Sequence, residues 1–258
     1  MRKFFKILKY LITEIADIIF WLNTPDKNFK KDGIFIEPNF FTQELCEELV
    51  EQAKTLLSDE SKSLGPYSWF YVRGNKGDGR DTKVRQFFGF NHLNDKLNEI
   101  VESETVTKTF EEKLGRKLVL MNCSMMVDEP DTETKRSFHS DNNPPPSFKA
   151  FVYLTDVKQE KNGPFSVIVG THRSHYLRAK NVISNIINDK KISDLETYLP
   201  NKEETAFTGE KGTAIFSTQT AFHRGNPKHS EKTRFMLVFY YSLESQGPHE
   251  EFSLGKDF

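Results

Sequence analysis

Cysteine is scarce in this chain, with only Cys46 and Cys123 among its 258 residues. The two lie far apart and show no CxxC spacing, which argues against a disulfide scaffold and a zinc ribbon. The sequence also lacks a surplus of charge of either sign. The formal net charge is −1 with a pI near 6.7, so no global field would draw the protein to nucleic acid. We therefore expect a cytoplasmic protein with no nucleic-acid partner, long enough for one domain with a sizeable core.

A long uncharged hydrophobic run is missing as well. Residues 1–23, "MRKFFKILKYLITEIADIIFWLN", are interrupted by Lys6, Lys9, Glu14 and Asp17, and no small-residue cleavage site follows them. This argues against a signal peptide and a membrane-spanning helix. Apolar residues instead recur at spacings of three and four, which predicts an amphipathic helix. They are Phe4, Leu8, Leu11, Ile15, Ile18 and Leu22.

Two hypotheses explain the apolar stripe of this N-terminal helix. The helix could pack on the protein's own core, or it could pack on a second subunit. Packing on a second subunit would make the protein a homo-oligomer. The helix could also lie in a membrane interface as a peripheral contact, with its basic residues near lipid phosphates. Those residues are Arg2, Lys3, Lys6 and Lys9.

The remaining chain reads as helices followed by strands. A helix is predicted from about Thr42, which would cap it, and a second helix over 94–114, ending at Gly115. The polar residues 174–208 look helical and could form a lid insertion over a pocket. Strands are predicted over 117–129, 147–157, 164–173, 212–225 and 233–243. The last two flank a short polar turn and predict a hairpin. The order indicates an α+β protein with a mainly β core, one domain over 24–258 built on a sandwich or barrel.

Two metal-ligand candidates stand side by side in "SFHSDNNPPP". His139 and Asp141 are two residues apart, so in a strand they would point to the same face. The best third ligand is His223, at the end of a predicted strand. Two histidines and one carboxylate leave three positions of an octahedral ion open, as in the non-haem Fe(II) oxygenases.

Arg234 is the second signal, because it opens the apolar run "RFMLVFYY" eleven positions after His223. A guanidinium there keeps its charge and needs an anion. A dicarboxylate co-substrate would supply one in bidentate geometry. The alternative is an ion pair with a neighbouring Asp or Glu.

These segments resemble one family. "FHSD", "FVYLTDVKQEKNGPFSVIVGTHR" and "GTAIFSTQTAFHRGNPKHSEKTR", with the earlier "DGIFIEPNFF", are similar to the phytanoyl-CoA dioxygenase family of Fe(II)/2-oxoglutarate oxygenases over about residues 30–243. The resemblance implies a double-stranded β-helix (jelly-roll, cupin-like) fold. It also implies His139, Asp141 and His223 as catalytic Fe(II) ligands and Arg234 as the clamp on the distal carboxylate of 2-oxoglutarate. Residues 1–23 lie outside the resemblance, so we expect them to be dispensable for the chemistry.

Further residues could bind the co-substrate or the substrate. Tyr153 could flank 2-oxoglutarate or belong to the core, and Asn122 and Ser124 share a strand face from which they could bond its carboxylates. A basic cluster could bind an anionic substrate or form a solvated surface. Its members are Arg73, Arg80, Lys83 and Arg85.

The predicted function is an Fe(II)- and 2-oxoglutarate-dependent dioxygenase that uses O2 and releases succinate and CO2. Asp141 favours hydroxylation of an unactivated C–H bond, because halogenases of the family lack this carboxylate. The substrate would be a small molecule, anionic or lipid-linked. The alternatives are a non-catalytic jelly-roll binding protein and a zinc hydrolase with the same three ligands, which would have no use for Arg234.

Overall fold

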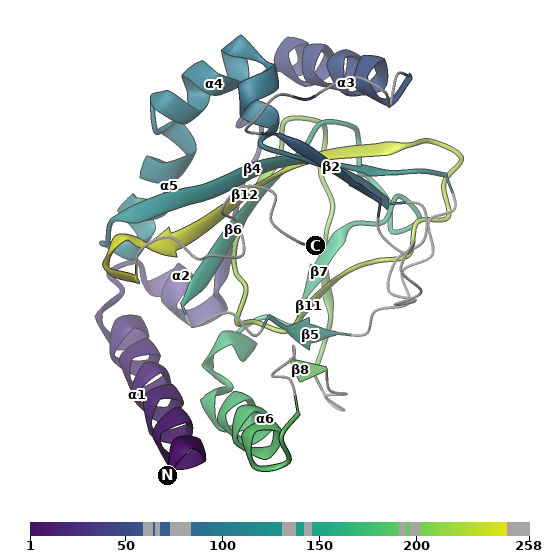
Figure 1. Cartoon of the computed structure of the whole chain (residues 1–258). Coiled ribbons are helices and arrows are strands. Elements are labelled where there is room, and N and C mark those ends of the chain that lie inside the picture. The colour runs from purple at the N-terminus through teal and green to yellow at the C-terminus, as the bar shows by residue number, and fades with distance from the viewer. Residues whose placement is uncertain are drawn as a thin grey trace.

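Two antiparallel sheets form the body of the computed structural model (Figure 1). The structure describes residues 1–58, 64, 68–72, 84–130, 138–141, 146–190, 195–196 and 202–246. The larger sheet has the strand order β1 (Ile34–Glu37), β10 (Ala214–Thr218), β6 (Ser147–Tyr153), β12 (Arg234–Leu243), β4 (Leu118–Asp128), β3 (Val84–Phe88) and β2 (Trp69–Val72). The smaller sheet has the order β8 (Leu195–Glu196), β5 (His139–Ser140), β11 (His223–Gly225), β7 (Phe165–Val167) and β9 (Thr205–Phe207).

The two sheets face each other across an aromatic and aliphatic core, as expected for a jelly roll. Phe151 of β6 lies 4.3 Å, centroid to centroid, from Phe165 of β7 in the opposite sheet. Val167 and Val238 are buried in the same cluster. Because side chains alternate along each strand, every second residue of β6 and β12 reaches this inner layer.

A second core lies between the larger sheet and the helices. The helices here are α2 (Lys27–Asp32), α3 (Gln43–Ser58), α4 (Asp95–Glu102) and α5 (Thr105–Leu114). The described residues also form three short 3-10 helices: η1 (Phe90–Leu93), η2 (Thr171–Arg173) and η3 (Glu244–Gln246). Leu49 of α3 and Phe110 of α5 are completely buried in this core with Phe216 and Phe239 of the sheet. The helices therefore cover one face of the sheet and leave its other face to the site.

The predicted helix starts are partly confirmed. The Thr42 hydroxyl accepts a hydrogen bond from the Leu45 amide at 3.2 Å, which caps α3. The single helix predicted over 94–114 is wrong, because α4 and α5 are separate. Glu104 breaks them with a left-handed φ of 58°, a conformation that interrupts a right-handed helix.

The hairpin predicted from the turn after residue 225 is also wrong. β11 pairs with β5 and β7 in the smaller sheet, whereas β12 pairs with β4 and β6 in the larger one. β12 is buried on both faces along nearly its whole length, so it stabilises the sheet best as a central strand. The connecting segment crosses from one sheet to the other and is bonded to the chain before β7, with the Asn226 amide donating to the Pro164 carbonyl at 3.0 Å.

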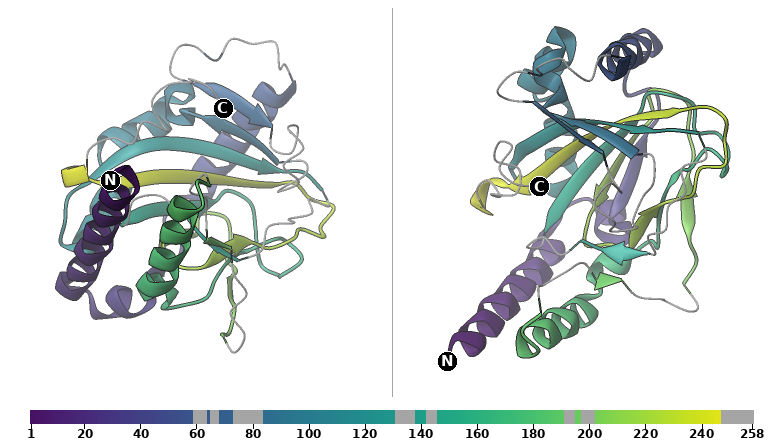
Figure 2. Two further views of the ribbon diagram at one scale, coloured as in Figure 1. Left: turned by 60° about the horizontal axis from the view of Figure 1, so that its bottom comes forward. Right: turned by 45° about the vertical axis from the view of Figure 1, so that its right-hand side comes forward.

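The N-terminal helix α1 (Arg2–Asn23) packs beside α6 (His175–Ile187) (Figures 1 and 2). Asp17, Phe20 and Trp21 of α1 are buried, and the two aromatic side chains belong to the core on the helix side of the sheet. Deleting residues 1–23 would remove these core contacts and so lower the stability of the fold. That the helix is dispensable for the chemistry stays a prediction. The predicted apolar stripe is exposed instead, which excludes its packing on the protein's own core.

Candidate active site

Three side chains from the smaller sheet converge inside the jelly roll. His139 opens β5, Asp141 follows that strand, and His223 opens β11 directly opposite His139 in the β-ladder. Oδ1 of Asp141 lies 3.4 Å from Nε2 of His139 and 3.8 Å from Nε2 of His223. All three side chains are buried. The pairing of β5 with β11 thus joins residues that are more than 80 positions apart in the chain.

The donor set fits a divalent metal ion. One donor atom from each of the three side chains lies within 4.8 Å of the others, and neighbouring ligands of a six-coordinate ion with bonds near 2.1 Å lie about 3 Å apart. Nδ1 of His223 donates to the Ala221 carbonyl at 2.9 Å. This hydrogen bond fixes the tautomer and leaves the Nε2 lone pair for a metal.

The protonation states agree with metal binding, which needs a neutral imidazole and an ionised carboxylate. Burial lowers the pKa of His223 to about 3, so its ring is neutral at physiological pH. Burial alone would raise the pKa of Asp141. The positive charge of Lys149, together with the contacts of the two histidine rings, outweighs this effect and holds the pKa of Asp141 well below its usual value.

Lys149 is a site residue that the sequence reasoning missed. Its Nζ donates to Oδ2 of Asp141 at 2.7 Å and stands 5.2 Å from the centre of the Tyr240 ring. This contact fixes the orientation of the Asp141 carboxylate and leaves Oδ1 facing the two histidines. The available signal was a single charged residue in the apolar strand "SFKAFVY", two positions from Phe151 and on its face.

A pocket between the two sheets opens onto the three ligands. Its lining includes residues from four strands of the larger sheet and three of the smaller, together with residues next to these strands. They are Val84, Met126, Asp128, His139, Asp141, Lys149, Phe151, Phe165, Gln219, His223, Gly225, Arg234, Met236, Val238 and Tyr240. The pocket therefore combines three candidate metal ligands and a buried arginine with apolar side chains from both sheets, a mixture found in small-molecule sites.

Arg234 lines this pocket and forms an ion pair with Asp128, its partner in the β4–β12 ladder. Nε of Arg234 donates to Oδ2 of Asp128 at 2.6 Å, and Nη2 contacts the same oxygen. This is the ion pair that the sequence left open as an alternative to a co-substrate clamp. A guanidinium has five N–H donors, so pairing through one edge does not prevent Arg234 from binding a carboxylate as well.

Three other predicted cofactor residues are not among those lining the pocket. The Tyr153 hydroxyl donates to the Phe207 carbonyl at 2.8 Å and accepts from the Phe165 amide at 2.9 Å. The Ser124 hydroxyl and the Asn122 side-chain oxygen accept hydrogen bonds from other parts of the chain. These hydrogen bonds brace the sheets, and contact of the three residues with 2-oxoglutarate stays a prediction.

The basic cluster and the lid insertion fall partly outside the described residues. Arg73, Arg80 and Lys83 lie there, while Arg85 pairs with Glu129 at 2.9 Å. Of residues 174–208, the structure describes α6, which packs on α1, and β8 and β9, which form the two edges of the smaller sheet. No described residue of this insertion lines the pocket. A lid formed by the rest of the insertion stays a prediction.

Fold and site together define a jelly-roll protein with a two-histidine, one-carboxylate metal centre. The family model of phytanoyl-CoA dioxygenase (PhyH) matches residues 29–236. The chain therefore belongs to the phytanoyl-CoA dioxygenase family of Fe(II)/2-oxoglutarate-dependent enzymes. No curated protein matches the sequence.

Solved structures share the fold at low sequence identity. EctD from S. alaskensis, solved with 2-oxoglutarate and 5-hydroxyectoine, has 16% identity and a TM-score of 0.62, with 89% of this chain and 82% of that chain covered. The α-ketoglutarate-dependent carbocyclase SnoK from nogalamycin biosynthesis has 15% identity and a TM-score of 0.60 over 83% and 81% of the two chains. HygX from Streptomyces hygroscopicus, solved with nickel, 2-oxoglutarate and hygromycin B, has 14% identity and a TM-score of 0.57 over 83% and 84%.

Proposed function

We propose that the protein is an Fe(II)- and 2-oxoglutarate-dependent dioxygenase that hydroxylates an unactivated C–H bond of a small molecule and releases succinate and CO2. The observation that carries this proposal is the buried group of His139, Asp141 and His223 in one pocket with Arg234. Family membership and neighbours solved with iron or 2-oxoglutarate support it.

The residues of the pocket have separate tasks in this proposal. His139, Asp141 and His223 would hold iron, which supplies O2 activation when bound. Lys149 holds the Asp141 carboxylate in place through Oδ2. Arg234, oriented by Asp128, binds the distal carboxylate of 2-oxoglutarate through its remaining donors.

The apolar side chains of the pocket would limit the access of water to the reacting groups. Phe151, Phe165 and Met236 are buried and line the pocket. Excluding water strengthens the attraction between Arg234 and a carboxylate. It also protects reactive species from side reactions.

Hydroxylation is the reaction that the ligand set favours. Asp141 occupies a position that would have to be open for a halide to reach the metal. Incubation of candidate substrates with Fe(II), 2-oxoglutarate and O2 should give a product one oxygen atom heavier, with one succinate formed per product. Neutral substrates, anionic substrates and lipid-linked substrates are compared in the same assay by mass spectrometry. A halogenated or hydrolysed product without succinate would contradict the proposal.

The Arg234–Asp128 ion pair is the observation that suits the second candidate, a zinc hydrolase with the same three ligands. In such an enzyme Asp128 would be sufficient as the counter-ion of Arg234, and no co-substrate would be needed. An anaerobic binding experiment with 2-oxoglutarate separates the two functions.

Arg234→Gln is expected to weaken 2-oxoglutarate binding by about 30-fold or more, because truncating one partner of a buried charge pair costs about 2–5 kcal/mol. Titration calorimetry of the metal-loaded protein measures the dissociation constant, and the affinity for the metal should stay within a few-fold of wild type. Asp128→Asn is the matched variant and should retain most of the 2-oxoglutarate affinity. Unchanged 2-oxoglutarate affinity in Arg234→Gln would favour the hydrolase.

A further inference from the structure

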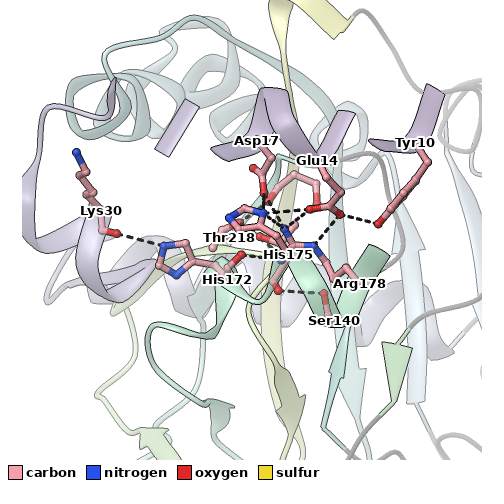
Figure 3. Close-up of polar contacts among 11 residues, drawn as sticks. Tyr10, Glu14, Asp17, Lys30, Ser140, His172, His175, Arg178 and Thr218 are labelled. Carbon is pink, nitrogen blue, oxygen red and sulfur yellow. Dashed lines mark hydrogen bonds and ion pairs between the residues drawn. The ribbon is translucent and has the colours of Figure 1, made fainter. Parts of the chain in front are cut away.

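Helix α1 turns its polar face toward the protein. Glu14 and Asp17 of α1 meet Arg178 of α6 in a buried network (Figure 3). Nη2 of Arg178 lies 2.9 Å from Oε2 of Glu14 and 2.8 Å from Oδ2 of Asp17, and Nε donates to Oε1 of Glu14 at 3.1 Å. The Tyr10 hydroxyl also donates to Oε1 of Glu14 at 2.6 Å. These contacts fix the rotation of α1 about its own axis.

The same network resembles a second metal site, because Glu14, Asp17 and His175 bring three donor atoms within 4.8 Å of one another. Arg178 contacts all three side chains, including Nδ1 of His175 at 2.9 Å. A guanidinium keeps its positive charge, so its place among these donors excludes a cation. The network is therefore a structural clamp between α1 and α6.

With the polar face clamped inward, the apolar face of α1 points to solvent. This reverses the usual orientation of a surface helix, whose apolar stripe faces the core. The exposed large apolar residues of α1 are Phe4, Phe5, Leu8, Leu11, Ile12, Ile15, Ile18, Ile19 and Leu22. Tyr176 and Ile187 of α6 are exposed too, and they line an apolar groove together with Leu11 of α1. We call these residues of α1 and α6 the docking face. A contiguous apolar surface of this kind marks an interaction site.

The exposed charges of α1 and α6 are basic, and one acidic residue lies next to them: Asp189, just after α6, pairs with Lys3 at 2.6 Å. Both acidic residues of α1 are buried and paired with Arg178, so every exposed charged side chain of α1 is cationic. These side chains are Arg2, Lys3, Lys6 and Lys9. Lys180 is the exposed charged residue of α6. Since the whole chain has a net charge of −1, this positive charge is a local property of the docking face.

We propose that the docking face binds the surface of a lipid bilayer that contains anionic phospholipid. Apolar side chains would enter the boundary between headgroups and acyl chains, and the basic side chains would contact lipid phosphates. Among the described residues, no helix is long and apolar enough to cross a bilayer, so α1 would lie along the surface.

A second copy of the chain suits this surface less well. A two-fold interface places the same patch of both copies face to face. Since every exposed charged side chain of α1 is cationic, such an interface would offer the basic side chains of either copy no acidic partner from α1. Charge complementarity thus favours an anionic lipid surface. This inference is independent of the reaction proposed for the pocket.

Vesicle co-sedimentation of the full-length protein tests the inference. Wild-type protein should bind vesicles of phosphatidylcholine and phosphatidylserine, bind pure phosphatidylcholine more weakly, and dissociate as salt is added. The double variant Lys6→Glu/Lys9→Glu should lower the partition coefficient about 25-fold or more. The triple variant Leu8→Gln/Ile12→Gln/Ile15→Gln should lower it by about tenfold or more, because its apolar groups no longer enter the bilayer.

Lys54→Glu/Lys108→Glu is the matched control, with the same change in net charge at exposed lysines of α3 and α5, and should bind like wild type. Circular dichroism should show native folding in all variants, whose substituted residues lie outside the core and outside the Arg178 network. Wild-type protein that binds neutral and anionic vesicles equally, or neither, overturns the proposal. Light scattering that shows an oligomer dissociated by the triple variant, without vesicle binding, would assign the docking face to a second copy.

Discussion

His223→Ala is expected to abolish 2-oxoglutarate turnover and to lower Fe(II) affinity by more than about 100-fold. The variant removes one of three protein ligands, and even the loss of a group that merely orients a ligand costs about 10–100-fold. Anaerobic Fe(II) titration measures the affinity, and succinate release measures turnover. The fold should be unaffected, because an alanine at this position keeps the backbone groups that pair with the β5 and β7 strands.

His229→Ala is the matched control for this experiment. His229 is an exposed histidine six residues after His223 in the connection to β12. Its removal should change neither Fe(II) affinity nor turnover. Undiminished Fe(II) binding by His223→Ala would contradict the assignment of the metal ligands.

Arg178→Ala is expected to lower the free energy of unfolding by about 3–5 kcal/mol. The change leaves Glu14 and Asp17 buried without their cation, and breaking a buried ion pair from one side costs about this much. It also removes the hydrogen bond from Nη1 of Arg178 to the His172 carbonyl at 2.6 Å. Urea denaturation followed by circular dichroism gives the free energy from the midpoint and the slope.

Lys180→Ala lies two residues further along α6 and serves as the matched control. Lys180 is exposed, so its replacement should change the free energy of unfolding by no more than about 0.5 kcal/mol. If Arg178→Ala were as stable as Lys180→Ala, the clamp between α1 and α6 would not hold the helix. The orientation of the docking face would then lack its physical basis.

The metal site was predictable from the sequence because its signals are local. His139 and Asp141 are two residues apart, and the segments around His223 carry the family's pattern. The fold class follows from the same resemblance and from the run of strands after residue 117. The pairing of β5 with β11 brings His223 next to His139 and Asp141. No local sequence pattern encodes this pairing.

The orientation of α1 was not predictable from its periodicity. Apolar spacing locates a stripe on a helix but does not say which face the protein covers. Here Arg178, more than 160 residues away from both acidic residues, pairs with Glu14 and Asp17 and draws the polar face inward. Contacts with a distant helix thus accompany the orientation of α1, and no pattern within residues 1–23 shows them.

Sequence periodicity is similarly incomplete as a guide to the strands. Alternation shows which residues share a face of the sheet, but not how far along the strand the pocket extends. Lys149 and Tyr153 share a face of β6, yet only Lys149 reaches the ligands, while the Tyr153 hydroxyl bonds the backbone of β7 and β9. The Arg234–Asp128 pair likewise depends on the register of β12 against β4.

Succinate release from 2-oxoglutarate tests the central claim most directly. Purified protein is freed of metal and then supplied with Fe(II) or Zn(II), each with 2-oxoglutarate in air. We predict succinate with Fe(II), none with Zn(II), and none with Fe(II) when O2 is removed. The absence of succinate under every condition, with candidate substrates present, would contradict the dioxygenase account and leave a binding protein or a zinc hydrolase.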